Sequence, residues 1–282
     1  MQITEHIHAL RIPFQIIVAP GMVIDRYVYV YLILGKRIAL VDTGVFGAGK
    51  IIFKYLEGLG RTSREISDVI LTHSHPDHIG SAKSIKELTG SLVHIHSAEK
   101  AWIESIELQF EERPVPGAGL LVEGSVKVDH VFEDGDIIRL GKDLEIEVFH
   151  TPGHSKGSVS FFMRKEKALF CGDAVLVPGQ MPIFEDLAGC VDSLSRLKRL
   201  DGVEVLLSSW DVPRKGAQAS GAIDESLKYL ADIHAAVRAA ALEDLSPDLM
   251  EFCKRITDKL GLPAAMVNPL VARSFRSVLN RS

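Results

Sequence analysis

The chain of 282 residues lacks features that mark four broad classes of protein. No apolar run approaches the ~18 residues of a transmembrane helix, so no membrane span is expected. Its 3 cysteines are odd in number and widely spaced, which argues against a disulfide framework. With 32 basic and 37 acidic residues, a net charge of −5 leaves no basic surplus for a nucleic-acid partner. Residues 1–15 lack a basic segment followed by an apolar run, so no signal peptide is expected and the cytoplasm is favoured.

Apolar segments of two periodicities alternate along the chain. Residues 27–34 and 38–44 predict a hairpin whose second strand is buried on both faces. Further strands are expected at 66–73, 91–97, within 126–173 and at 203–210, and helices at 48–60, 80–90, within 97–120 and at 190–200. About sixty Ala- and Leu-rich residues then predict C-terminal helices, interrupted by "LSPD" (245–248) and "LGLP" (260–263).

The stretch "LTHSHPDHIG" holds four residues of the kinds that bind metals within six positions. His73 and His75 are separated by one residue, so an extended backbone points both rings to one side, as a zinc site requires. Pro76 favours a turn, after which Asp77 and His78 face a neighbouring point. Because the cluster directly follows a predicted buried strand, it indicates a site for one or two metal ions rather than a solvated loop.

This stretch resembles the H-x-H-x-D-H signature of the metallo-β-lactamase superfamily. Three further segments resemble family motifs in the same order: "VDTG" with Asp42, "HTPGHSKGSVSFF" with His154, and "LFCGDAV" with Asp173. Together the matching motifs cover roughly residues 15–212. The resemblance implies an α/β (α+β) fold, a four-layer αββα sandwich over residues 1–214, with a C-terminal helical extension over 215–282 packing on it.

The resemblance also implies a set of metal ligands. The predicted ligands are His73, His75 and His154 at the first metal, Asp77 and His78 at the second, and Asp173 bridging the two. Asp77 is in addition the predicted catalytic residue. Asp42 either helps to fix the ligand loops or forms a turn at a strand end.

One position departs from the family pattern. The family usually supplies a last histidine after the final strand, and here Trp210 stands at that place in "LLSSWDVP". Tryptophan offers only an N–H donor and cannot bind a metal through it, which leaves the second site short of a ligand. Asp211 either substitutes as an oxygen ligand or is a turn residue before Pro213.

The implied activity is that of a metal-dependent hydrolase. Zinc is the expected metal, as one or two ions, with iron and manganese as alternatives. A metal-bound hydroxide would cleave a thioester or ester bond, lactones included, in a small molecule. Because the sequence shows no dedicated acid for a poor leaving group, thioesters and activated esters are favoured. The C-terminal helices resemble those of glyoxalase II-like thioesterases, and Lys215, Arg273 and Arg276 are either anion-binding or merely solvated.

Two other functions are considered. In the first, His73, His154 and Asp173 hold a single Fe(II), as in the sulfur (persulfide) dioxygenases of the family. In the second, Trp210 marks a degenerate site that binds metal without turnover. The expected partner is a small-molecule substrate, and a homo-oligomer is possible. Neither nucleic acid nor a membrane is expected, since the chain is acidic and shows no inserted nuclease domain.

Overall fold

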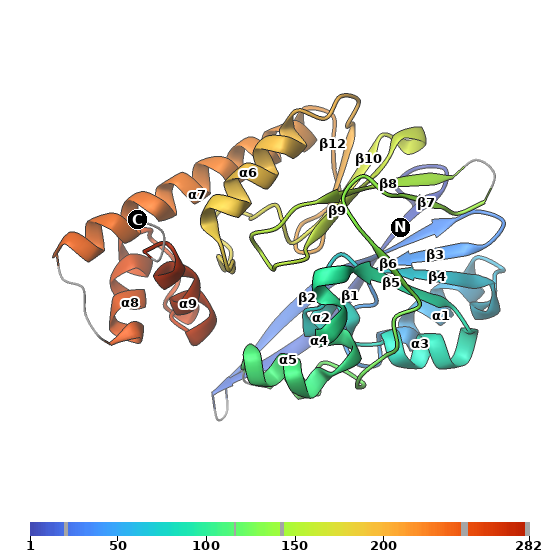
Figure 1. The fold of residues 1–282 in the computed structure, drawn as a ribbon, viewed down its shortest axis with the longest axis horizontal. Helices are drawn as coiled ribbons and strands as arrows, with labels where there is room; N and C mark the ends of the chain where they lie inside the picture. The colour runs from blue at the N-terminus through green and yellow to red at the C-terminus, as the bar shows by residue number, and fades with distance from the viewer. Residues whose placement is uncertain (20–21, 116, 142–143, 244–247, 280–282) are drawn as a thin grey trace.

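Two six-stranded sheets form the centre of the computed structural model, which describes residues 1–19, 22–115, 117–141, 144–243 and 248–279 (Figure 1). The first sheet contains, in spatial order, β1 (Ile7–Ala19), β2 (Met22–Leu34), β3 (Ile38–Val41), β4 (Ile66–Ile70), β5 (Leu92–His96) and β6 (His130–Phe132). The second contains β12 (Arg214–Lys215), β11 (Val205–Ser208), β10 (Ala168–Gly172), β9 (Val159–Met163), β8 (Glu145–His150) and β7 (Ile137–Arg139).

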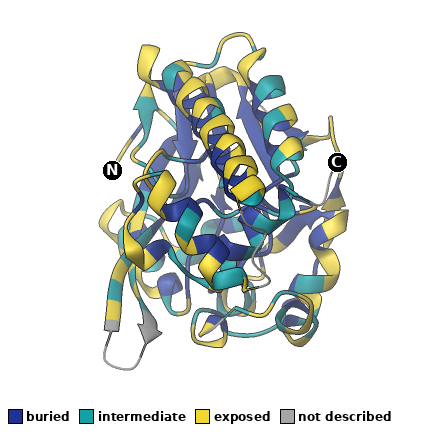
Figure 2. Cartoon of the chain, turned by 90° about the vertical axis from the view of Figure 1, so that its left-hand side faces the viewer, coloured by how far each residue is buried: buried dark blue, intermediate teal, exposed yellow. Residues whose placement is uncertain are grey.

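Most helices lie on the outer faces of the two sheets, whereas the last two lie beyond the end of the sandwich, at the left of Figure 1. Those beside the first sheet are α1 (Ala48–Gly58), α2 (Pro76–Ile79), α3 (Ala82–Thr89), α4 (Lys100–Glu104) and α5 (Ile106–Glu112). Beyond the second sheet are α6 (Leu187–Lys198), α7 (Ala217–Glu243), α8 (Leu249–Lys259) and α9 (Pro269–Ser277). Figure 2 shows the strands largely buried, with exposed residues gathered on the surrounding helices and loops.

Apolar side chains on both faces of each sheet produce the layers. In β2, Val28, Val30 and Leu32 pack toward the helices, whereas Tyr29 and Tyr31 pack toward the second sheet, because successive side chains point to opposite faces. Three separate apolar clusters result: helices against the first sheet, sheet against sheet, and the second sheet against α6–α9. Three such interfaces make four layers, so the predicted αββα sandwich is confirmed.

The strand β1 was not predicted. Arg11 and Pro13 interrupt its apolar pattern, and a proline is disfavoured inside a sheet because it donates no hydrogen bond. The structure accommodates Pro13 because β1 is the edge strand, paired only with β2 in the described part of the chain, and Pro13 lies opposite Tyr27. The strand that pairs with β1 is also longer than the sequence indicated. β2, the first strand of the predicted hairpin, starts at Met22 rather than near Tyr27.

The C-terminal helices share a core with the sandwich. One apolar cluster joins Phe162 and Leu169 of the second sheet to Leu194 of α6, Leu230 of α7 and Phe275 of α9. The strand β12 straddles the predicted boundary between residues 214 and 215. The predicted break at "LSPD" falls largely on residues 244–247, which lie outside the described residues, whereas α8 ends at Lys259, as "LGLP" predicted.

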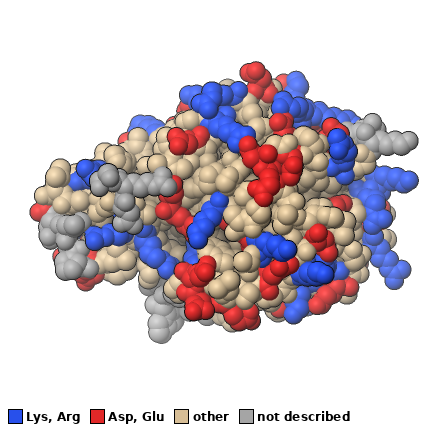
Figure 3. Space-filling view, viewed as in Figure 1, with Lys and Arg blue, Asp and Glu red and all other residues tan. Residues whose placement is uncertain are grey.

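The surface of the described chain has two further properties. None of its helices is both long and apolar enough to span a membrane. Basic and acidic side chains are interspersed over the face shown in Figure 3, without a large area of one sign.

Candidate metal centre

The predicted ligands converge where strands of both sheets end. His73 follows β4, and His75 and His78 lie at and just within the start of α2. His154 lies in the loop between β8 and β9, and Asp173 directly follows β10. The carboxyl ends of β4 and β10 thus bring together residues that are about a hundred positions apart in the sequence.

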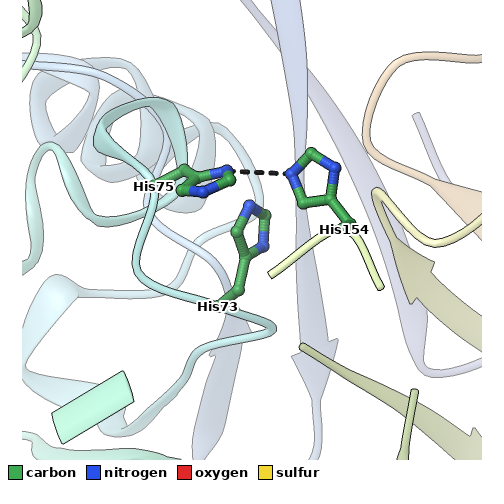
Figure 4. Close-up of side chains that lie close together, drawn as sticks. All are labelled: His73, His75 and His154. Carbon is green, nitrogen blue, oxygen red and sulfur yellow. Dashed lines mark hydrogen bonds between the residues drawn. The ribbon is translucent and has the colours of Figure 1, made fainter. Parts of the chain in front are cut away.

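Three histidines form the first group (Figure 4). Nδ1 of His75 lies 2.8 Å from Nε2 of His154, and one ring nitrogen each of His73, His75 and His154 lies within 4.8 Å of the others. All three residues are buried. A set of three inward-pointing imidazoles is the usual protein contribution to a catalytic zinc site.

His73, His78 and Asp173 form a second group with the same spacing. Nε2 of His78 lies 3.3 Å from Oδ1 of Asp173 and 3.5 Å from Oδ2 of Asp77. His73 belongs to both groups, so the two candidate metal positions are adjacent. The structure therefore brings together all six residues that the sequence singled out.

Unsatisfied polar atoms show that the donor set suits a cation. Within the described chain, Nε2 of His73, Nε2 of His78 and Oδ1 of Asp173 are buried without a hydrogen-bond partner. Leaving such atoms unpaired is costly, and a metal ion at their common centre would satisfy them. Nδ1 of His154 contacts the carbonyl oxygen of Ile183 at 2.8 Å, which fixes the ring so that Nε2 faces the centre.

The carboxylate of Asp42 contacts two residues of the ligand loop. Its carboxylate accepts hydrogen bonds from the backbone N–H and the hydroxyl of Thr72, both at 2.8 Å, and contacts Nδ1 of His78 at 2.8 Å. Asp42 is buried and has a φ of 62°, a left-handed conformation that costs a residue with a side chain about 1 kcal/mol. Its role in fixing the ligand loop thus prevails over that of a simple turn residue.

The protonation states of the histidines differ by position. Burial, together with neighbouring positive charge, lowers the pKa of His73 and His75, and burial also lowers the pKa of His154. Burial would lower the pKa of His78 too, but the carboxylates of Asp173, Asp77 and Asp42 raise it well above its usual value. The three histidines of the first group are therefore neutral near pH 7, as metal ligands must be.

Asp173 stays ionised over the whole physiological range. Burial alone would raise the pKa of Asp173, but the nearby imidazoles of His78 and His154 and the hydrogen bond from Trp210 lower it to about 2. An ionised carboxylate between the two histidine groups is the form that a bridging ligand requires.

Trp210 directly contacts the predicted bridging ligand. Its Nε1–H donates a hydrogen bond of 2.9 Å to Oδ2 of Asp173. Asp211 instead accepts from Nε of Arg214 at 2.6 Å and from the backbone N–H of Val212, so its carboxylate is engaged away from the cluster. The turn interpretation of Asp211 is thereby supported, and Trp210 supplies a donor where the family usually supplies a ligand.

Glu99 was missed by the sequence analysis. This buried carboxylate accepts hydrogen bonds from the backbone N–H and hydroxyl of Ser74 through Oε2, and from the Ser155 hydroxyl and the Gly157 N–H through Oε1. It thereby ties the His73–His75 loop to the His154 loop. An acidic residue three positions after a buried strand was the available signal, but its partners are 25 to 58 positions away.

Two glycines allow the ligand loops to pack closely. Gly153 has a φ of 130°, and a Cβ there would lie 2.3 Å from the backbone nitrogen of Cys190. Gly172 has a φ of 50°, and a Cβ there would lie 2.9 Å from the side chain of Thr72. These contacts explain why glycine directly precedes His154 and Asp173.

A largely apolar pocket opens onto the metal centre. Its cavity volume is about 150 Å³, and its mouth is open to solvent. His75, His154, Asp77 and Asp173 line one part of it. The apolar part of the wall comes from β1, the loop after β10 and α9, with Phe14, Ile16, Val175, Leu176, Met181, Ile183 and Leu270.

Comparisons with known proteins agree with this geometry. A family model described as "Metallo-beta-lactamase superfamily" matches residues 23–209. The hydroxyacylglutathione hydrolase of Rhodospirillum rubrum is 27% identical over 219 residues, covering 76% of this chain and 72% of that protein. The acyl-coenzyme A thioesterase MBLAC2 of Gallus gallus is 34% identical over 118 residues, covering 38% of this chain and 40% of that protein.

The chain covers a smaller share of most curated relatives than of a similar solved structure. The chain spans 57–66% of the length of six further curated relatives. The crystal structure of a metallo-beta-lactamase family protein from Thermus thermophilus superimposes with a TM-score of 0.73 at 23% identity. That match covers 98% of this chain and 93% of the other and establishes the likeness of fold.

Proposed function

The chain belongs to the metallo-beta-lactamase superfamily, and from that premise we propose that it is a metal-dependent hydrolase of small-molecule thioesters or esters. Hydrolytic function is the general property that its matched relatives support. The thioester preference is the more specific part of the proposal. It is supported by the names of two relatives, a hydroxyacylglutathione hydrolase and an acyl-coenzyme A thioesterase.

One observation carries the proposal: two groups of ligand atoms share His73 at the base of a pocket. His73, His75 and His154 would hold a first ion, and Asp77, His78 and Asp173 a second. Zinc bound there would supply a water with a pKa near 7 and would polarise the carbonyl oxygen of the substrate. The protein fixes this arrangement through Asp42 and the carbonyl of Ile183.

The lining of the pocket favours a thiolate leaving group. Apart from the histidines and aspartates of the centre, the charged side chains on its described wall are Arg26 and Arg113. Arginine does not give up its proton near neutral pH, so neither can serve as a general acid for an alkoxide or amine. A thiolate departs without a proton. Asp77 reaches the pocket, and we propose that its carboxylate orients the attacking water by accepting a hydrogen bond from it.

Metal content and thioester turnover together test the proposal. Protein purified without chelator should contain one or two zinc ions per chain and should hydrolyse S-lactoylglutathione or a simple S-acyl thiol. His154→Ala should reduce turnover by at least about a thousandfold, because the first ion loses one of three protein ligands. The matched control, His234→Ala, changes an exposed histidine on α7 and should leave both readouts unchanged. Normal activity in His154→Ala would show that the ligand set is wrong.

A second candidate is a mononuclear Fe(II) sulfur dioxygenase. The observation that favours it is the hydrogen bond from Trp210 to Asp173, which stands where a last ligand for a second ion would be. His73, His154 and Asp173 would then be a two-histidine, one-carboxylate set. Oxygen uptake with glutathione persulfide, together with about one iron per chain, would favour this candidate, and the absence of any bound metal would leave only a degenerate protein.

A further inference from the structure

Two arginine side chains face the pocket with few partners of their own. Arg26, on β2, has its guanidinium 5.4 Å from the ring centre of Trp210, and Arg113 follows α5. Among the described residues, neither guanidinium donates a hydrogen bond, and the one ion pair is that of Arg113 Nε with Glu185 at 3.8 Å. The side chain of Arg113 is only 13% exposed. Such a group normally uses several of its five N–H donors.

Burial and the nearby carboxylate of Asp77 act in opposite directions on the two arginines. Burial lowers the pKa of both guanidinium groups, and the nearby carboxylate of Asp77 raises the pKa of each. Arg113 lines the same pocket as His75 and His154, which places its positive charge close to the metal ligands. Once Asp77 binds a metal cation, its charge is no longer available to the arginines. Two guanidinium groups beside a metal centre, with one ion pair to Glu185 between them in the described chain, favour an anion in the pocket.

The basic residues named from the sequence do not meet this need. Arg273 donates a hydrogen bond of 2.7 Å to the carbonyl of Pro114, and Lys215 donates one of 2.7 Å to the carbonyl of Ile3. Neither lines the pocket at the metal centre. The arginines that line the pocket are instead Arg26 and Arg113, which belong to no motif of the sequence.

Apart from the metal centre, the two arginines, Gln180 and Trp210, the pocket wall is apolar. Leu176 and Met181, from the segment after β10, face the pocket together with Leu270 of α9 and Phe14 of β1. Burying a methylene group against such a wall contributes about 0.8 kcal/mol, or about a fourfold gain in affinity. A hydrocarbon chain of several carbons is the complement of this surface.

We propose that the pocket binds an amphipathic anion, with a carboxylate or phosphate group of the substrate held by Arg113 and Arg26 and its hydrocarbon chain against the apolar wall. This inference rests on the proposed function and assigns it a substrate class: acyl thioesters or esters that carry a negative charge. Bidentate binding by arginine suits both carboxylate and phosphate, so the two anions are distinguished by experiment.

Binding of simple probes to the metal-loaded protein tests this inference without turnover. Calorimetric titration with octanoate, octyl phosphate, octanol and acetate compares charge and chain length. We expect one of the two eight-carbon anions to bind at least about tenfold more tightly than both octanol and acetate. The tighter of the two identifies the anionic group. Octanol binding as tightly as both anions would overturn the inference.

Substitutions identify the groups responsible. Arg113→Met should weaken binding of the preferred anion by about 10- to 100-fold and leave octanol unchanged, and Arg26→Met should act in the same direction. Arg139→Met, a matched control at an exposed arginine on β7, should change nothing. Glu185→Gln removes the partner of Arg113 but keeps the guanidinium, so anion binding should be retained or strengthened. Loss of anion binding in Glu185→Gln would indicate a structural role for the pair.

The outcomes separate this inference from the proposed function. Anion binding that depends on Arg113, in a protein that hydrolyses no thioester, would reject the proposed function and retain the anion site. Thioester hydrolysis with anion binding that is unaffected in both Arg113→Met and Arg26→Met would reject the anion site alone. If Arg113→Met does not fold, Arg26→Met on β2 and Arg113→Lys give the same comparison.

Discussion

Replacing Glu99 by glutamine should loosen both ligand loops at once. Each carboxylate oxygen of Glu99 serves one loop, with Ser74 N–H at 3.2 Å on one oxygen and Gly157 N–H at 2.8 Å on the other. An amide retains only one acceptor oxygen, and its NH2 group faces the donors of the other loop. A serine hydroxyl can rotate to accept a hydrogen bond, but a backbone N–H cannot.

The expected magnitude follows from this count of donors. One buried backbone N–H left without an acceptor costs about 1–3 kcal/mol. Loss of the negative charge weakens the remaining hydrogen bonds, and we expect a total of about 3 kcal/mol in the free energy of unfolding. For a chain of this length that corresponds to a fall of roughly 5 °C in Tm. Because Ser74 and Ser155 adjoin predicted ligands, zinc affinity should also fall by about 10- to 100-fold.

Thermal unfolding of Glu99→Gln and competition for zinc with a chromogenic chelator measure the two effects. The matched control is Glu87→Gln, an exposed glutamate on α3, which should change neither Tm nor zinc affinity. A Glu99→Gln protein with the Tm and zinc affinity of the wild type would refute the role assigned to this carboxylate. A fall in Tm without any change in zinc affinity would restrict that role to folding.

Three other perturbations probe separate parts of the molecule. Trp210→His should raise the affinity for a second zinc ion, because it replaces a hydrogen-bond donor to Asp173 by a metal ligand. Trp210→Phe should not raise this affinity. Counting zinc ions per chain by mass spectrometry measures the difference. Burial raises the pKa of Cys171 to about 12, and all three cysteines are buried, so a thiol reagent at pH 8 should label the chain only after unfolding. Gly153→Ala should lower the free energy of unfolding by more than about 3 kcal/mol, because its Cβ would clash with a backbone nitrogen 2.3 Å away at a φ of 130°. Gly47→Ala, with a φ of 77° and open space around it, should cost only about 1 kcal/mol.

The helices and strands followed the periodicity of the sequence where that pattern was clean. The helix over Ala48–Gly58 and the buried strand Ile38–Val41 were predicted because their apolar residues recur at helical and strand spacing. The strand Ile7–Ala19 was missed, since its pattern is broken by an arginine and by a proline that only an edge position tolerates.

The predicted ligands were found because most of them are neighbours in the chain. His73, His75, Asp77 and His78 lie within six residues, so their proximity is fixed by covalent connection and one turn at Pro76. His154 was added by resemblance to a family motif, and the structure brings its Nε2 to 2.8 Å from Nδ1 of His75. That all of these residues bind metal stays a prediction.

What surrounds the ligands was decided by tertiary structure alone. The sequence placed Trp210 at the position of a missing ligand, but only folding brings its N–H to Asp173, 37 positions earlier. The Glu99 carboxylate and the guanidinium of Arg113 reach the centre from segments with no motif of their own. A sequence motif contains only functional residues that are near neighbours in the chain. Hydrogen bonds and charges that support a site can come from any element that packs beside it, so their sources become visible only when the layers are assembled.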